Sequence, residues 1–283
     1  MNIDFTKMHG AGNDFIMVNG FKDDLANYDY SKIASKLCNR HFAIGADGLI
    51  IVLPAESRSN DFKMRIFNSD GSEAEMCGNG IRCFAHFLQE EGLTEKTSLN
   101  IETLAGIISP QLISYSKKAS KVKVNMGQPR FKPAEIPIKL DEDLENVQDF
   151  KLKAADNVFD INCVSMGNPH TVIFVDDIEQ YKLNIWGEKI ENHEIFPEKT
   201  NVEFIEKVSS DEIVMKVWER GAGITLACGT GAAAAVAAGI KKGILNDRVL
   251  VHLPGGDLII EWSDQDVFMT GPSEKVFKGE IKI

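Results

Sequence analysis

The sequence lacks the features that indicate a membrane, secreted or nucleic-acid-binding protein. Its N-terminus, MNIDFTKMHG, has no apolar segment of the kind found in signal peptides. The most apolar stretch, Ile224–Ile240, is rich in alanine and glycine, which predicts a buried helix rather than a membrane span. With 42 acidic residues against 31 basic ones and no basic run, the chain offers little to a polyanion. We therefore expect a cytoplasmic protein with no nucleic-acid and no membrane partner.

Cysteine is also sparse. Five cysteines in 283 residues do not form a disulfide scaffold, which suits a reducing compartment. Their spacing matches neither a zinc site nor a C-x-x-C redox motif. Nothing in the sequence resembles a pyridoxal phosphate lysine site or a dinucleotide-binding motif. We predict that the protein uses no cofactor and no metal.

What the chain does contain is a repeat. Residues Met64–Leu93 and Met215–Ile244 align without a gap, and Cys77 falls on Cys228 at an offset of 228 − 77 = 151. Gly78, Gly80 and Gly92 fall on glycines at the same offset. Upstream of each copy, Asn13 in HGAGNDF and Asn168 in MGNPH occupy similar motifs at an offset of 168 − 13 = 155. The repeat predicts two homologous halves, each with one cysteine at the same structural place.

Local patterns predict a strand, a glycine turn and an apolar helix in each copy. The helices are expected at Gly80–Glu90 and Gly231–Lys241. Alternating or β-branched runs predict strands at Phe15–Val18, Leu49–Leu53, Phe62–Phe67, Lys121–Met126, Thr171–Val175, Glu212–Trp218, Val249–Leu253, Asp257–Trp262 and Lys275–Ile283. The stretch Met126–Asp149, rich in Pro, Asp and Glu, predicts a mobile surface connection.

The length suits two domains of about 140 residues, each with its own core. We expect one half at residues 1–120, carrying Cys77, and the other at residues 121–271, carrying Cys228. The last strand, residues 272–283, has no counterpart in the repeat and is expected to return to the first half.

Each repeated cysteine stands just before glycines that open a helix. Free N–H groups and the positive end of the helix dipole meet there, which favours thiolate over thiol and makes the cysteine a usable base. The same N–H groups can hold a carboxylate and stabilise charge that develops on it. The residues that supply them are Gly78, Asn79, Gly229 and Thr230.

A single cysteine beside a glycine turn is more often a small core residue than a catalyst. Two at equivalent positions of a divergent repeat favour catalysis, because paired thiols can remove a proton from one face of a carbon and return it to the other. Cys38, Cys83 and Cys163 have no partner in the repeat and are assigned to packing.

Five ordered motifs resemble the diaminopimelate epimerase family along almost the whole chain. They are KMHGAGNDF at Lys7–Phe15, FNSDGSEAEMCGNGIRC at Phe67–Cys83, MGNPH at Met166–His170, FPEKTNVEF at Phe196–Phe204 and ERGAGITLACGTGA at Glu219–Ala232. The resemblance implies a cofactor-independent epimerase that interconverts LL- and meso-diaminopimelate, a step toward lysine and a peptidoglycan precursor. It implies an α+β fold of two pseudo-symmetric domains, each a mostly antiparallel, barrel-like sheet around a central helix.

The resemblance also assigns roles to residues. Cys77 and Cys228 match the family's acid and base pair, and the site is expected in the cleft between the halves. The substrate-binding positions it implies are Asn13, Asn68, Gly78, Asn79, Asn168, Asn201, Glu219, Arg220, Gly229 and Thr230. Arg220 would clamp the distal carboxylate with its planar donor fork, and Glu219 would take the ammonium group. His170 would support the thiols. The expected partner is the small-molecule substrate, with a homodimer as the candidate assembly.

One position departs from the family pattern. Where many members carry glutamine after GFD, this chain has Gly48 after Gly45-Ala46-Asp47. Gly48 offers no side chain to a substrate, and Asp47 is expected to order the turn rather than to bind.

Alternative functions stay open at this point. Proline and hydroxyproline racemases have the same fold and paired cysteines, whereas phenazine-biosynthesis-like isomerases have the fold without that pair. The Glu219-Arg220 pair favours a substrate with a charged distal end, which proline lacks. A non-catalytic amino-acid-binding protein would need no thiol pair, and a thiol-disulfide protein would be expected to carry C-x-x-C.

Overall fold

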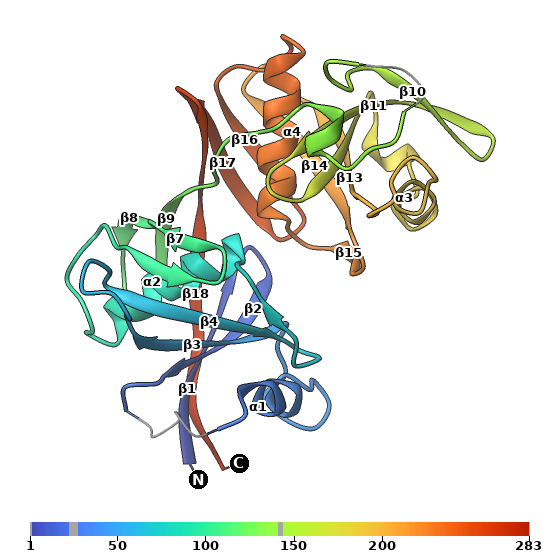
Figure 1. Cartoon of the computed structure of the whole chain (residues 1–283). Coiled ribbons are helices and arrows are strands. Elements are labelled where there is room, and N and C mark those ends of the chain that lie inside the picture. Colours follow the sequence, from blue (N-terminus) through green and yellow to red (C-terminus); the bar gives the residue numbers. More distant parts are fainter. Residues whose placement is uncertain (1, 23–27, 141–143, 283) are drawn as a thin grey trace. The chain divides into compact units, whose positions relative to one another are not determined.

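The computed structural model describes residues 2–22, 28–140 and 144–282. The chain divides into two compact units (Figure 1). Unit 1 contains Met1–Asn125 and Thr270–Ile283, and unit 2 contains Met126–Met269. The last strand, β18 (Asp266–Lys282), begins in unit 2 and pairs in unit 1 with β1 (Asn2–Gly10) in antiparallel register.

Unit 1 is a strand layer wrapped around one helix, α2 (Gly78–Glu90). The paired strands run in the order β8–β9–β18–β1–β2–β3–β4–β6–β7, with β2–β3 and β4–β6 parallel. α2 packs against β1, β2, β3, β8 and β9. The remaining elements are β2 (Asn13–Asn19), α1 (Tyr30–Leu37), β3 (Gly48–Pro54), β4 (Phe62–Asn68), β5 (Glu73–Ala74), β6 (Ile101–Thr103), β7 (Gly106–Ile108), β8 (Gln111–Tyr115) and β9 (Ala119–Asn125).

Unit 2 repeats this plan around α4 (Gly229–Lys241), which packs against β11, β12, β13 and β17. Its strands run in the order β10–β11–β12–β13–β14–β16–β17, with β12–β13 and β14–β16 parallel. The elements are 3₁₀ turns at Pro133–Glu135 and Ile178–Gln180, β10 (Phe150–Ala154), β11 (Asn157–Ser165), β12 (Pro169–Val175), α3 (Leu183–Glu191), β13 (Asn201–Lys207), β14 (Glu212–Glu219), β15 (Gly223–Thr225), β16 (Arg248–Leu253) and β17 (Gly256–Ser263).

The two central helices begin and end in the same way. Cys77 and Cys228 are their N-cap residues and have extended backbone angles. After each helix a glycine takes a left-handed conformation, Gly92 with φ 66° and Gly243 with φ 74°. The N–H groups of these glycines and of the residues after them bond back to the last helical turn, which satisfies carbonyls that the helix leaves unpaired.

The structure confirms the predicted fold class and places a strand at each predicted strand segment. Three expectations need correction. Each unit has a second described helix, α1 or α3, which the sequence patterns did not predict. β18 starts at Asp266 rather than Lys275. The stretch 126–149 is not simply a surface connection, because its apolar residues Ile136, Ile138 and Val147 are buried in the unit 2 core; residues 141–143 lie outside the described part.

Candidate active-site residues

Cys77 stands at the start of α2, and its half-buried thiol faces an asparagine from another strand. The Sγ atom lies 3.6 Å from Oδ1 of Asn13, which also accepts a hydrogen bond of 3.2 Å from Nδ2 of Asn79. Asn13 reaches this place because the β1–β2 turn passes through Ala11 and Gly12, both with positive φ. Three predicted site residues, Asn13, Cys77 and Asn79, are thus in contact within unit 1.

The other end of the Asn13 amide is held by Asp47. Asn13 Nδ2 donates to Asp47 Oδ2 at 2.8 Å, and the Asp14 backbone N–H donates to the same oxygen at 3.0 Å. Arg40 bridges the carboxylates of Asp47 and Asp14. Burial alone would raise the pKa of Asp14, but hydrogen bonds from Arg40 and Lys7 hold it well below its usual range. The Asp47 side chain thus holds the start of β2 and fixes the orientation of Asn13, and the expectation that it does not bind substrate stays a prediction.

Gly48, where the family pattern has glutamine, lies in a crowded backbone position. A Cβ atom there would approach the carbonyl oxygen of Phe67 to 2.8 Å and a ring carbon of Phe15 to 3.4 Å. A side chain would therefore force β3 away from β4. In this chain Gly48 allows the close pairing of β3 with β4. The residue before it, Asp47, accepts the hydrogen bond from Asn13.

Asn68 is the exposed last residue of β4, and its Nδ2 donates to Ser72 Oγ at 3.0 Å across the turn that leads to β5. Gly78 and Asn79 form the first turn of α2, as the carboxylate cradle requires. Beneath that turn lies Arg82, fully buried, which donates to the Gly78 carbonyl, to Asn79 Oδ1 and to the Pro272 carbonyl. This role of Arg82 could not be predicted from the sequence, because an arginine in a helix usually faces solvent.

Cys228 is the equivalent residue of unit 2 and is more buried than Cys77. Its Sγ accepts a hydrogen bond from the Gly231 N–H at 3.3 Å and lies 3.5 Å from Thr230 Oγ1. Burial raises the pKa of the Cys228 thiol well above its ordinary value, and the carboxylates of Glu219 and Glu203 raise it further. Burial and the two carboxylates thus act against the thiolate form that the helix N-terminus favours.

A row of hydrogen bonds leads away from Cys228. Asn168 Nδ2 donates to Thr230 Oγ1 at 3.3 Å, and Asn168 Oδ1 lies 2.9 Å from His170 Nε2. His170 Nδ1 lies 2.7 Å from Oε1 of Glu203, and both of these side chains are fully buried. The structure thus brings Asn168, His170 and Thr230 together, and it adds Glu203.

The residues expected at the distal end of the substrate lie around the β14–β15 turn. Asn201 Oδ1 accepts from the Arg220 backbone N–H at 2.9 Å, and its Nδ2 donates to the Pro169 carbonyl. The exposed Arg220 side chain donates to the carbonyl of Glu198, and Glu219 accepts from Thr225 Oγ1. Glu191 of α3, which the sequence did not single out, accepts from the Gly221 N–H at 2.9 Å and holds this turn.

The other three cysteines are buried and free, in agreement with their assignment to packing. Burial raises the pKa of Cys38, Cys83 and Cys163 to about 12. Each is therefore a neutral thiol at physiological pH.

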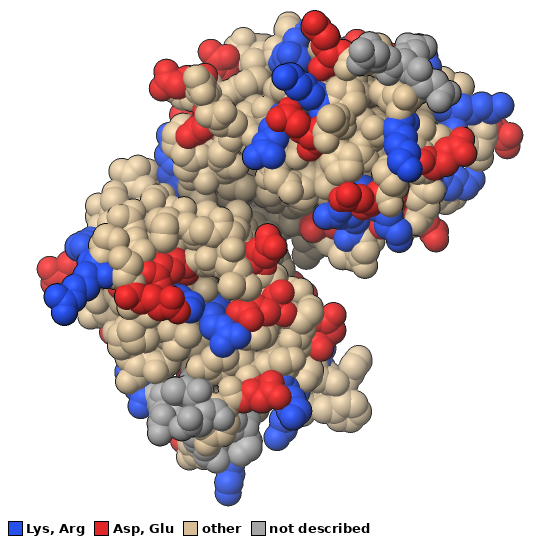
Figure 2. Space-filling view, viewed as in Figure 1, with Lys and Arg blue, Asp and Glu red and all other residues tan. Residues whose placement is uncertain are grey.

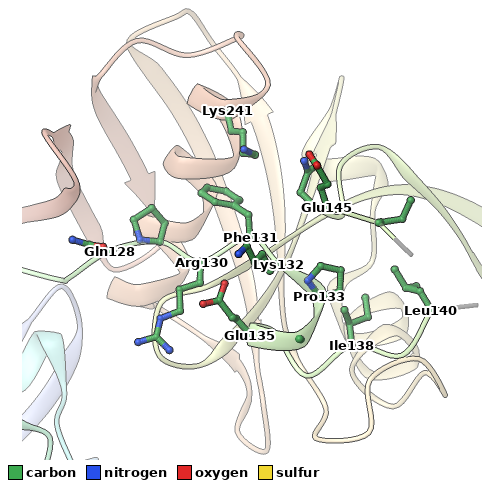
Figure 3. A pocket seen from close by; sticks show the side chains of 14 residues that line it. Gln128, Arg130, Phe131, Lys132, Pro133, Glu135, Ile138, Leu140, Glu145 and Lys241 are labelled. Atoms are coloured by element: carbon green, nitrogen blue, oxygen red, sulfur yellow. The ribbon is translucent and has the colours of Figure 1, made fainter. Parts of the chain in front are cut away.

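A cavity of about 1110 Å³ lies elsewhere in unit 2 (Figure 3). It is lined mainly by residues 128–135, and the Phe131 ring packs under the Lys241 ammonium group at 4.7 Å. No predicted site residue is among its described lining residues. The volume of this cavity therefore does not identify the proposed cysteine site.

The surface is mixed in charge. On the face shown in Figure 2, Lys and Arg side chains are interspersed with Asp and Glu. No described helix is both long and apolar enough to cross a membrane.

Comparison with known proteins identifies the family. The family model for diaminopimelate epimerase matches residues 5–132 and 162–276. The chain belongs to the diaminopimelate epimerase family. A diaminopimelate epimerase from Halothermothrix orenii is 62% identical over 283 residues, which covers 100% of this chain and 99% of the relative. One from Methanococcus maripaludis is 47% identical over 281 residues, covering 99% of each chain.

Solved structures of more distant proteins share the fold. A phenazine biosynthesis protein from Bacillus anthracis matches with a TM-score of 0.72 and 20% identity over 100% of both chains. A hydroxyproline epimerase from Agrobacterium vitis, with bound trans-4-hydroxy-L-proline, matches with a TM-score of 0.68 and 14% identity, covering 99% of this chain and 91% of the other. At these identities the likeness concerns the fold alone.

Proposed function

We propose that this member of the diaminopimelate epimerase family interconverts LL- and meso-diaminopimelate without a cofactor, in lysine and peptidoglycan precursor biosynthesis. The observation that carries the proposal is the pair of cysteines at equivalent N-caps, Cys77 on α2 and Cys228 on α4. We propose further that the two units are homologous halves that each contribute one thiol to one reaction.

The reaction needs one group to take the α-proton from one face of the carbon and a second group to deliver a proton to the other face. A thiolate and a thiol at two helix N-termini fit these roles. The N–H groups of Gly78, Asn79, Gly229 and Thr230 would stabilise the charge that builds on the reacting carboxylate. Burial, with the nearby carboxylates of Glu219 and Glu203, raises the pKa of the Cys228 thiol, which suits proton delivery.

The distal amino acid end would be recognised by Arg220 and Glu219. Their turn is fixed by Asn201 and Glu191, which hold its backbone N–H groups. Asn13 and Asn168 each stand beside one cysteine or its helix turn, and their amides can bind the reacting end. Asn68 is assigned to substrate by the family motif alone.

The test is epimerisation of LL-diaminopimelate by four purified proteins. We expect the wild-type protein to be active in the presence of a chelator. Cys77→Ala and Cys228→Ala should lose epimerisation in both directions, whereas Cys83→Ala should keep it. Proline and hydroxyproline serve as control substrates. Turnover of these and not of diaminopimelate, or substrate binding without turnover, would contradict the proposal.

For assembly and location we propose a homodimer in the cytoplasm. Five free cysteines are consistent with a reducing compartment. The dimer rests on the sequence resemblance alone, and light scattering of the purified protein tests it.

A further inference from the structure

Glu203 is a buried acidic residue whose position needs an explanation. Its side chain is fully buried in β13, and Oε1 lies 2.7 Å from His170 Nδ1. Its other oxygen, Oε2, is buried with no hydrogen-bond partner among the described residues. A Cβ atom on Gly231 would meet Oε1 at 2.7 Å, so the carboxyl group packs directly under the first turn of α4. A buried acid with a half-satisfied carboxyl group is unfavourable for folding, so it points to a function.

The equivalent place in unit 1 is apolar. Phe15 pairs with Gly48 in β2–β3, as His170 pairs with Asn201 in β12–β13. Two residues further along β3 and β13 stand Ile50 and Glu203. A Cβ atom on Gly80 would meet the Ile50 side chain, as one on Gly231 would meet Glu203. The fold is therefore compatible with Phe and Ile where unit 2 has His170 and Glu203.

The hydrogen-bond geometry defines the protons of this pair. In the structure Asn168 Nδ2 lies 3.3 Å from the Thr230 hydroxyl, and Asn168 Oδ1 lies 2.9 Å from His170 Nε2. A carbonyl oxygen only accepts, so Nε2 must carry a proton. The contact between His170 Nδ1 and Glu203 Oε1 holds one further proton, on either atom. Without Glu203 the neutral ring is free to carry its one proton on Nδ1, and the Asn168 amide would then turn over.

We propose that Glu203 is a positioning residue: through His170 it fixes the side-chain amide of Asn168 beside Thr230 and Cys228. The Thr230 hydroxyl, which accepts from Asn168, lies 3.5 Å from Cys228 Sγ. The row of contacts thus extends from a buried carboxyl group to Cys228, one of the two proposed acid-base cysteines. This proposal rests on the proposed function and adds a residue to it.

The unit 1 pair supplies the decisive variant. The double substitution His170→Phe and Glu203→Ile installs the side chains found at the same register positions of unit 1 and leaves neither polar partner buried alone. We expect it to fold, with a melting temperature within about 5 °C of wild type. We expect kcat/KM for diaminopimelate to fall about 100-fold, because a misplaced binding group costs about that much. Glu203→Gln, whose amide can donate to Nδ1, should retain more activity than the double variant.

Ile50→Leu is the matched control, at the equivalent position of unit 1, and should leave kcat/KM unchanged. A folded double variant with kcat/KM near wild type would overturn the proposal, because the pair would then serve stability alone.

Nuclear magnetic resonance of ¹⁵N-histidine-labelled wild-type protein tests the proposal independently of activity. We expect the His170 ring, identified by the loss of its signals in the double variant or in His170→Phe, to carry a proton on Nε2. A His170 ring with its only proton on Nδ1 would overturn the positioning role. If the wild-type protein fails to epimerise diaminopimelate, the proposed function fails, and this spectrum still decides the role of Glu203.

Discussion

Asn13 is held at both ends of its side-chain amide, with the oxygen toward Cys77 and the nitrogen toward Asp47. Asp47→Ala should release the amide and lower kcat/KM about 10- to 100-fold, the effect of losing a hydrogen bond to a charged group worth about 1.5–3 kcal/mol. Asp61→Ala is the control. Asp61 likewise accepts a backbone N–H, from Asn100, and forms an ion pair, with Lys96, but it contacts no proposed site residue in the described part of the chain. Steady-state kinetics and thermal melting check this; equal kinetic losses in both variants would contradict it.

At the residue scale, the repeat was enough to predict that Cys77 and Cys228 stand at equivalent helix N-termini. An N-cap position follows from local sequence, and CGNG and CGTG place Cys77 and Cys228 there. The raised pKa of Cys228 could not be predicted, because its burial and the approach of Glu219 and Glu203 arise only in the folded chain. Glu203 itself stands in the run NVEF, where strand alternation does not reveal that its side chain points into the core.

At the element scale, α3 packs so closely on β14 that a helix glycine is required. A Cβ on Gly187 would lie 2.5 Å from the Trp218 side chain. Replacing a helical glycine by alanine normally gains about 1 kcal/mol, but overpacking costs about 1–3 kcal/mol. We therefore expect Gly187→Ala to destabilise the protein by about 1 kcal/mol in urea unfolding. The exposed Asn184→Ala on the same helix should not, and a stabilised Gly187→Ala protein would contradict this packing.

Three strands of unit 2 are joined by a titratable side chain. His252 of β16 contacts Glu212 of β14 and Asp257 of β17, each at 2.8 Å, and these hydrogen bonds raise the pKa of His252 above its ordinary 6.5. The stabilisation that protonated His252 gains from these two carboxylates is fully present below about pH 6.5. It is lost as the pH rises through the pKa of His252 in the folded protein. Because the site is partly exposed, we expect at most about 1 kcal/mol. His252→Gln should remove this part of the pH dependence of unfolding between pH 6 and 8; an unchanged profile would contradict it.

Elements with strong local patterns were predicted, and those that depend on partners were not. The helices α2 and α4 carry apolar sequence and glycine boundaries, so their positions were off by only two residues at the start. α1 and α3 are short, and tertiary packing decides them. β18 was predicted too short because Gly271 and Pro272 interrupt its strand pattern. Its additional pairing with β9 is visible only in the folded chain.

At the scale of the whole molecule, the chain terminus completes the unit that begins the chain. β18 pairs with β1 from Asn2 to His9, and Ser273 lies 3.2 Å from the buried His86 of α2. Removing residues 272–283 should therefore unfold unit 1, because β1 loses its partner strand and the α2 core is opened. Limited proteolysis should cut the truncated chain within residues 2–125. A truncated protein with wild-type melting and protection would contradict this role.

The central claim is that two cysteines act on opposite faces of one carbon, and deuterium incorporation tests it most directly. In deuterated water the proton delivered comes from a thiol that has exchanged with solvent, so each isomer should yield product that carries solvent deuterium. The remaining substrate should stay unlabelled at early times. Mass spectrometry of both separated isomers at early reaction times measures the deuterium content of product and of remaining substrate. Product labelled ahead of substrate, in both directions, is the expected result. Substrate labelled as fast as product would indicate a single exchanging base and would contradict the two-cysteine account.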